Sequence, residues 1–205
     1  AMPNTITSPV YVCRDNIDTD QIIPAQYLTL VPTIAEEYEK LGSYAMIGLP
    51  DDQYPVKFVP TGELKTPYKI IIAGRNYGCG SSREHAPIAL GAAGVEAVIA
   101  ESFARIFFRN CVATGELYPY DAKERLCEKI KTGDIGTLDA DGFLTITDRK
   151  KDMIITSGGK NIAPQGLEND IKLGRYVSQA LVVGDRRPYA VALVTLDPAE
   201  IVPWA

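Results

Sequence analysis

The loop at residues 76–87 holds the side chains best suited to chemistry. It reads Asn-Tyr-Gly-Cys-Gly-Ser-Ser-Arg-Glu-His-Ala-Pro and follows an apolar run. Gly80 and the glycine two residues before it allow a tight backbone, and Ser81, Ser82 and Arg83 lie where a helix is expected to begin. Free N–H groups at a helix start, the positive end of the helix dipole and a bidentate guanidinium together favour a bound carboxylate. The loop therefore predicts a site for a small polyacid.

Two other readings of the same loop stay open at the level of composition. Glycine-rich turns and serine caps begin many helices that bind no ligand. A dinucleotide site is disfavoured, because the loop lacks a third glycine and a downstream acidic partner for a ribose.

The segments around the loop predict how it is positioned. Residues 68–74 form a buried apolar run typical of a strand, 86–93 suit a helix, and 97–100 suit a second strand. This order indicates a βαβ unit with parallel strands, whose site lies at the carboxyl end of the first strand. A further amphipathic helix is expected over 102–109.

An acidic loop precedes this unit. Residues 9–12 suit a short strand, and the polar residues that follow include Asp18 and Asp20. The two carboxylates have three possible roles, which are orienting Arg83, positioning the loop at residues 76–87 and capping a local turn. A helix is expected over residues 33–41, and an irregular connection leads from there to the strand at 68–74.

Composition restricts the partners and the compartment. The chain has 205 residues, of which 21 are basic and 26 acidic, with a net charge of −5 and no long run of either sign. This balance predicts neither a nucleic-acid partner nor a membrane partner. The four cysteines are widely spaced, which predicts reduced thiols and no metal site. No apolar stretch is long enough for a membrane span, so we expect a protein of the cytoplasm or, in a plant, of the plastid stroma.

Beyond composition, three strings in the first half carry a family resemblance. Residues 15–25 (DNIDTDQIIPA) and 78–86 (GCGSSREHA) resemble the paired signatures of the aconitase family swivelling domain. The match is closest to the small subunits of isopropylmalate dehydratases, continues through 97–110 (AVIAESFARIFFRN) and covers about residues 8–120. The resemblance implies a swivelling β/β/α domain.

The resemblance also implies an activity and a set of site residues. The expected enzyme is a hydro-lyase that interconverts 2-isopropylmalate and 3-isopropylmalate through a dehydrated alkene in leucine biosynthesis. Ser81 would act as the alkoxide-like base, while Arg83, Ser82, Gly80 and Asp20 would bind the substrate or hold those groups in place. His85 is as compatible with a packed or capping residue as with a proton carrier. Apolar residues within 28–32 and 42–49 would recognise the isopropyl group.

Cofactor and partner follow from the same resemblance. The Lewis acid of the family is an iron–sulfur cluster in a separate large subunit, so this chain is expected to bind no cofactor and no metal. The expected assembly is a heterodimer or heterotetramer with that large subunit, and the small subunit alone would be inactive.

The second half resembles another family. Residues 132–136, 141–152 and 157–165 closely resemble the C-terminal lid of AMP-forming acyl-CoA synthetases, and 177–189 extend the match to long-chain fatty acid ligases. In that family Asp134 would bind the ribose, Arg149 would contact the nucleotide, and Lys151 would lie at the hinge. The large ligase domain with its phosphate loop is missing from this sequence, so a stand-alone ligase is not expected.

The sequence thus predicts two parts in one α/β chain. Residues 1–125 are expected to form the swivelling domain and 132–205 a small α+β lid-like segment, with a boundary within 120–136. The two families meet at a shared Thr-Gly-Asp, which indicates a fusion. Two alternatives remain: a non-catalytic fusion or fragment carrying a synthetase lid, and a tail whose strands, such as 190–196, complete the first domain.

Overall fold

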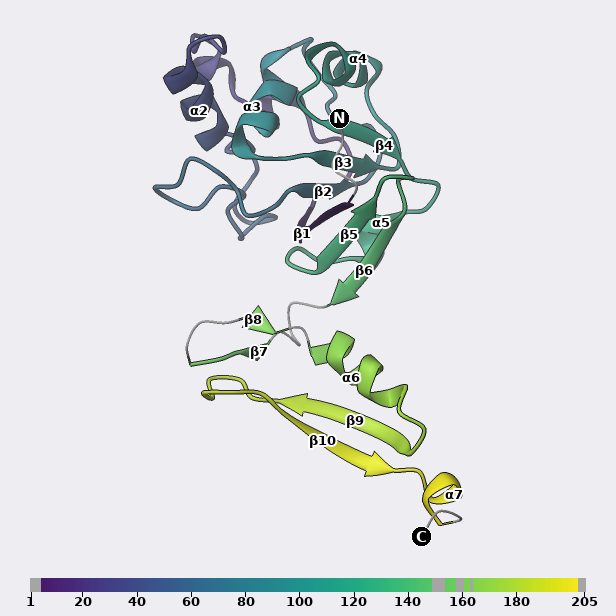
Figure 1. The fold of residues 1–205 in the computed structure, drawn as a ribbon. Coiled ribbons are helices and arrows are strands. Elements are labelled where there is room, and N and C mark those ends of the chain that lie inside the picture. The colour runs from purple at the N-terminus through teal and green to yellow at the C-terminus, as the bar shows by residue number, and fades with distance from the viewer. Residues whose placement is uncertain (1–4, 149–153, 158–160, 163, 203–205) are drawn as a thin grey trace. The chain divides into compact units, whose positions relative to one another are not determined.

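The computed structural model describes residues 5–148, 154–157, 161–162 and 164–202 (Figure 1). The chain divides into two compact units, residues 1–144 and 145–205. Each unit is described by itself.

The first unit is built on a mixed sheet with the strand order β4-β3-β2-β1-β5-β6. Four strands run parallel, and their bounds are β1 Thr5–Val12, β2 Ile70–Ala73, β3 Ala97–Ala100 and β4 Tyr118–Asp121. Strand β5 (Ile135–Asp139) lies antiparallel to β1, and β6 (Leu144–Asp148) is the last strand in the order. The predicted α/β class and the parallel β2–β3 pair are confirmed.

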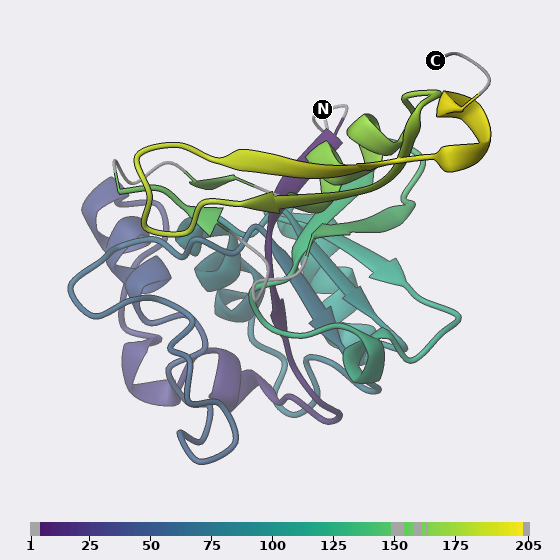
Figure 2. The same ribbon diagram turned by 90° about the horizontal axis from the view of Figure 1, so that it is seen from below.

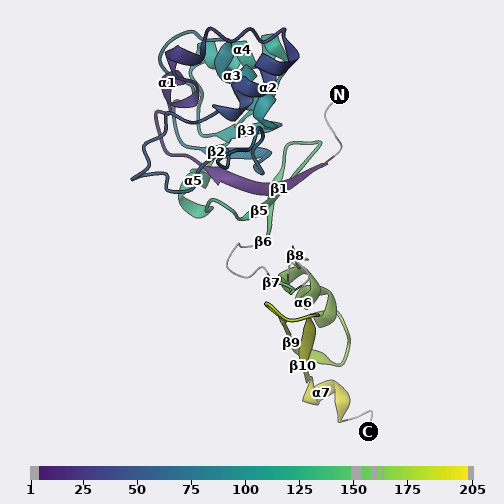
Figure 3. The same ribbon diagram turned by 90° about the vertical axis from the view of Figure 1, so that its left-hand side faces the viewer.

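Helices cover one face of this sheet. Helices α2 (Ala35–Ser43), α3 (His85–Ala93) and α4 (Arg105–Thr114) lie on the same side of the strands (Figures 1 and 3). The short α1 (Thr19–Ile22) and the 3-10 turn η1 (Ala25–Tyr27) lie in the connection from β1 to β2. The small helix α5 (Leu126–Lys129) follows β4 and precedes β5 in sequence. It packs near β2.

The core forms where apolar residues of the strands meet these helices. Strands β2 and β3 are buried along their whole length, as expected for parallel strands in the middle of a sheet. Ile71 and Val98 belong to the same hydrophobic cluster as Leu90 of α3 and Phe107 of α4. The carboxyl ends of the strands are thus held firmly, and the loops that follow them form the candidate site.

Two elements differ from the expected bounds. Helix α4 begins at Arg105, because Phe103 stays extended and forms a bridge with Tyr77. The first unit also continues beyond the expected junction at 120–136, because β5 pairs with β1 from Pro9↔Ile135 to Thr5↔Asp139.

The second unit contains an antiparallel hairpin and a helix. Strands β9 (Val177–Val183) and β10 (Val191–Leu196) run side by side (Figure 2), and α6 (Pro164–Lys172) packs on β9, where Ala180 and Val182 are buried. The remaining elements are β7 (Ile154–Ile155), β8 (Asn161–Ile162) and α7 (Pro198–Ile201). Strand β10 agrees with the strand expected over 190–196.

Candidate active site

The serine loop, residues 76–84, follows the carboxyl end of β2 and is bonded to the chain on both sides. Toward β1, the Gly78 N–H donates to the Ile17 carbonyl (2.7 Å), and the Cys79 carbonyl accepts from the Thr19 N–H (2.8 Å). Toward β3, the Tyr77 N–H donates to the Ser102 carbonyl (3.0 Å). The loop is therefore fixed between the segments that follow β1 and β3.

Gly78 makes this close packing possible. Its φ is +75°, and an added Cβ would lie 2.2 Å from Cγ of the buried Phe107. Only glycine fits a left-handed backbone so close to an aromatic ring. Phe107 in turn packs edge-on against Tyr77, with ring centroids 5.3 Å apart. The start of the loop is thus anchored on α4.

The two serines lie on the exposed part of the loop. Ser81 and Ser82 are both exposed, and Gly80 before them has a φ of +94°. The backbone of Ser81 is still held, because its carbonyl accepts a hydrogen bond from Thr19 Oγ1 (3.1 Å). The hydroxyl of Ser81 is therefore accessible to a substrate while its main chain is fixed.

Arg83 is the positive charge next to these serines. Its Nη1 donates to Asp20 Oδ1 (2.6 Å) and to the Ile23 carbonyl (3.1 Å). The Arg83 side chain is 13% exposed and that of Asp20 is 59% exposed. Both contacts use Nη1, so the donors of Nε and Nη2 are not used by these two bonds.

The structure gives each of the two acidic residues one of the proposed roles. Asp18 caps α1: its Oδ1 accepts from the Gln21 N–H (2.7 Å), and its own N–H donates to Gln21 Oε1 (3.0 Å). Asp20 in the first turn of α1 orients Arg83. The capping role applies to Asp18 and the orienting role to Asp20.

The start of α3 contributes less to anion binding than the sequence suggested. The Ala86 and Ile88 N–H groups donate to the carbonyls of Arg83 and Glu84, and Pro87 between them has no N–H. His85 bonds through Nε2 to the Leu30 carbonyl (3.2 Å), as a packed histidine does. Arg83 is therefore the main positive group of the loop.

Sequence reasoning did not identify the role of Thr19. It is 1% exposed, and it holds the loop through both its N–H and its hydroxyl. The only sequence signal is its place between Asp18 and Asp20, which does not reveal a bond to a loop about sixty residues later.

A charged network at the same edge of the sheet was also missed. Arg125 makes a bidentate bond to Asp15 (2.9 and 3.1 Å) and a further bond to Glu101 Oε2 (3.0 Å). Glu101 Oε1 accepts from Arg75 Nε (2.7 Å). The hydrogen bond from Arg125 lowers the pKa of Asp15, and the hydrogen bond from Arg75 lowers that of Glu101. The network ties the segments after β1, β2, β3 and β4 together.

All four cysteines are free thiols. Burial raises the pKa of Cys111 to about 12 and raises that of Cys13 as well. Burial, and then the nearby Asp18 carboxylate, raise the pKa of Cys79 in the serine loop. Within the described ranges no three His, Cys, Asp or Glu side chains are grouped as metal ligands.

Of the three residues expected to bind a nucleotide, Asp134 lies within the described part of the chain. Asp134 lies in the turn before β5 in the first unit, is 8% exposed, and accepts the Lys131 N–H at its Oδ2 (3.0 Å). This gives Asp134 a structural role. Arg149 and Lys151 lie outside the described residues.

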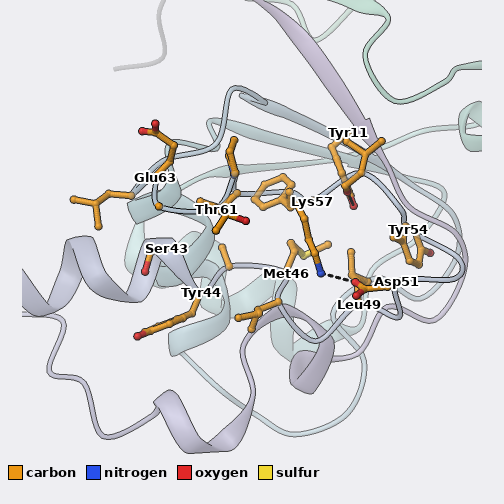
Figure 4. Close-up of a pocket in the computed structure, with 18 residues that line it drawn as sticks. Tyr11, Ser43, Tyr44, Met46, Leu49, Asp51, Tyr54, Lys57, Thr61 and Glu63 are labelled. Atoms are coloured by element: carbon orange, nitrogen blue, oxygen red, sulfur yellow. Dashed lines mark hydrogen bonds and ion pairs between the residues drawn. The ribbon is translucent and has the colours of Figure 1, made fainter.

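A large cavity of about 450 Å³ lies elsewhere in the first unit (Figure 4). It is formed mainly by the segments 43–49 and 56–64, with Tyr11 of β1, and it includes none of the serine-loop residues. In the part of the chain that is described, no helix is long and apolar enough to cross a membrane.

The fold and the serine loop define a class: a parallel α/β domain that presents a serine pair and an anchored arginine at the carboxyl edge of its sheet. Residues 10–121 match the aconitase C-terminal domain, so the chain belongs to that family. Residues 151–202 match the C-terminal domain of AMP-binding enzymes.

Individual relatives agree with this division. The chain is 65% identical over 129 residues to 3-isopropylmalate dehydratase small subunit 1 of Arabidopsis thaliana, a match that covers 63% of this chain and 51% of the relative. A crystal structure of 3-isopropylmalate dehydratase from Methanocaldococcus jannaschii superposes with a TM-score of 0.50 at 35% identity, covering 78% of this chain and 80% of that one. A long-chain fatty acid–CoA ligase of Mycobacterium tuberculosis is 54% identical over 74 residues, which is 36% of this chain and 12% of the ligase. The chain thus spans about half the length of the plant relative.

Proposed function

We propose that this chain is the small subunit of a 3-isopropylmalate dehydratase, which interconverts 2-isopropylmalate and 3-isopropylmalate through a dehydrated alkene. The observation that carries the proposal is the exposed Ser81 hydroxyl on a fixed backbone beside the anchored Arg83. The similarity to plant dehydratase small subunits supports this substrate class.

Ser81 is proposed as the base of the reaction. Its Oγ, in the alkoxide-like state, takes the carbon-bound proton in the dehydration and returns it in the rehydration. A serine hydroxyl is a weak base, so the site must stabilise a negative oxygen. In the serine loop, Arg83 is the cation next to Ser81. The hydrogen bonds of Arg83 to Asp20 and to the Ile23 carbonyl fix the direction of its guanidinium group.

Arg83 is also proposed to bind one substrate carboxylate, together with Ser82 and the backbone of Gly80. A planar guanidinium matches a carboxylate through two parallel hydrogen bonds. Asp20 is a positioning residue, because its proposed action passes through Arg83.

The departing hydroxyl needs a Lewis acid. We place the Lewis acid, an iron–sulfur cluster in the related enzymes, on a large subunit. The active form would be a heterodimer or heterotetramer. The similarity to a plant subunit supports a location in the plastid stroma, and the cytoplasm is the alternative.

Reconstitution tests this proposal. The full chain is mixed with a tagged large subunit of a plant isopropylmalate dehydratase carrying its cluster, and co-purification and alkene absorbance from 3-isopropylmalate are measured. The proposal predicts a stable complex and alkene formation that neither subunit shows alone. A stable complex that forms no alkene, or a chain that does not bind the large subunit, would contradict it.

A further inference from the structure

The cavity beside Tyr11 has the walls of a small-molecule site. Its volume of about 450 Å³ lies within the usual range for ligand pockets. The floor is apolar and buried, and Met46 and Phe58 are each 3% exposed. Ile47 and Leu64 at the margin are 47% and 48% exposed, so apolar surface continues to the opening.

Three polar groups on the inner walls, from Tyr11, Tyr54 and Met46, are already bonded to the protein. The Tyr11 hydroxyl donates to the Val56 carbonyl (2.8 Å), and the Tyr54 hydroxyl accepts from the Arg14 N–H (3.0 Å). The sulfur of Met46 accepts from the Tyr77 hydroxyl (3.6 Å). A ligand that placed polar groups against these walls would lose hydration without gaining partners, so the inner part of the ligand must be apolar.

The margin of the cavity carries three charged side chains, Lys57, Asp51 and Glu63, of which Lys57 and Asp51 form a pair. Lys57 points to Asp51, and the two form an ion pair of 2.5 Å (Figure 4). Their side chains are 58% and 73% exposed, so the pair stabilises the fold by no more than about 1 kcal/mol. A ligand can therefore separate the two side chains at small cost.

The ion pair of Lys57 and Asp51 determines which charged group of a ligand fits the margin of the cavity. A lone carboxylate at Lys57 would lie beside the Asp51 carboxylate, and a lone ammonium at Asp51 would lie beside the Lys57 amine. Like charges at such distances repel. A head group with both charges gives each side chain an opposite charge, and an α-amino acid has that arrangement on adjacent atoms.

We propose that this cavity binds an α-amino acid with an apolar side chain. Its carboxylate would bind Lys57 and its ammonium Asp51, and its side chain would fill the cavity between Met46 and Phe58.

This site is separate from the serine loop but is attached to the helix that carries Asp20. The Met46 N–H donates to the Ile22 carbonyl (2.7 Å), and the Gly48 N–H donates to the Gln21 carbonyl (3.1 Å). The wall of the cavity and α1 thus share backbone bonds.

Direct binding to the full chain tests the proposal without reference to catalysis. L-leucine is titrated by calorimetry and compared with 4-methylpentanoate, 3-methylbutylamine and glycine, which lack the ammonium, the carboxylate and the apolar side chain. L-leucine is expected to bind, and each analogue to bind roughly tenfold or more weakly, as the loss of one charged bond or one buried side chain requires. No binding of L-leucine or L-phenylalanine, or equal binding of the analogues, would overturn the proposal.

Variants of the exposed charges provide the second arm. Lys57→Gln and Asp51→Asn are each expected to weaken L-leucine binding by about tenfold. Lys65→Gln and Asp52→Asn make the same charge changes at exposed positions that do not line the cavity, and should leave binding unchanged. Binding that is unaffected by both cavity variants would overturn the assignment of the head group.

Discussion

Arg83 lies between a structural partner and a proposed ligand. Asp20 and the Ile23 carbonyl hold Nη1, and the remaining nitrogens are proposed to face the substrate carboxylate. A lysine has one ammonium at this position and cannot keep the two protein contacts and a bidentate ligand contact with the same geometry.

We therefore expect Arg83→Lys to raise the KM of the reconstituted complex for 3-isopropylmalate by roughly tenfold or more, with a smaller change in kcat. Arg109→Lys, an exposed position on α4, is the matched control and should keep the original KM. A KM that stays unchanged in Arg83→Lys would show that the arginine serves the fold alone.

Gly78 tests the packing of the serine loop. In Gly78→Ala the new methyl group would meet the ring of Phe107 and the residue would keep a positive φ, so we expect a loss of about 2 to 5 kcal/mol in the free energy of unfolding. Gly62→Ala also has a positive φ but open space around it, and should cost about 1 kcal/mol. Urea denaturation of both variants measures the difference, and equal losses would mean that the contact with Phe107 does not limit the loop.

At the scale of elements, the Arg125 network joins the ends of four strands. The pKa values of Asp15 and Glu101 are lowered in the folded chain, so both carboxylates add stability above their unfolded pKa values. That contribution is lost as the pH falls from about 4 toward the lower folded pKa values.

Arg125→Gln should accordingly lower stability at pH 7 and flatten the loss of stability between about pH 4 and pH 2. Thermal unfolding of the wild type and the variant across this range measures the effect. Lys123→Gln removes an exposed positive charge close to Arg125 in sequence and is the control. Parallel stability curves for Arg125→Gln and the wild type would contradict the role of the network.

Local sequence patterns were sufficient to predict the central strands and the helix between them. Strands β2 and β3 and helix α3 follow from apolar runs and helical spacing, and the expected helix 86–93 differs from α3 by one residue. The beginning of α4 could not be predicted, because the pairing of Phe103 with Tyr77 replaces the first helical turn. Strand β5 could not be predicted either: its residues were assigned to the lid-like segment, and its partner is the distant β1.

In the candidate site, too, residues adjacent in sequence could be predicted to act together, whereas contacts between distant residues could not. Ser81, Ser82 and Arg83 are adjacent in sequence, so their type and spacing predict a common site. The bonds from Thr19 to the serine loop, and the bond from Asp15 to Arg125, join residues far apart in sequence. No local pattern marks such contacts.

At the scale of the whole molecule, the two units should unfold separately. Residues 131–139 belong to the first unit, because the Val10 N–H donates to the Asp134 carbonyl (2.9 Å) and the Val12 N–H to Thr132 Oγ1 (3.0 Å). Hydrogen exchange should therefore protect 131–139 together with β1, while β9 and β10 exchange in a separate, less stable step. A single step that includes β1 and β10 would contradict two independent units.

The central claim is that Ser81 supplies the base, and turnover of Ser81→Ala in the reconstituted complex tests it most directly. The residue is exposed, and its backbone carbonyl keeps its bond to Thr19, so the variant should fold and bind the large subunit as the wild type does. Loss of a positioned base predicts a fall in kcat of about a hundredfold or more. Ser178→Ala, an exposed serine on β9, is the control and should retain full activity. If Ser81→Ala keeps most of the wild-type kcat, Ser81 is not the base.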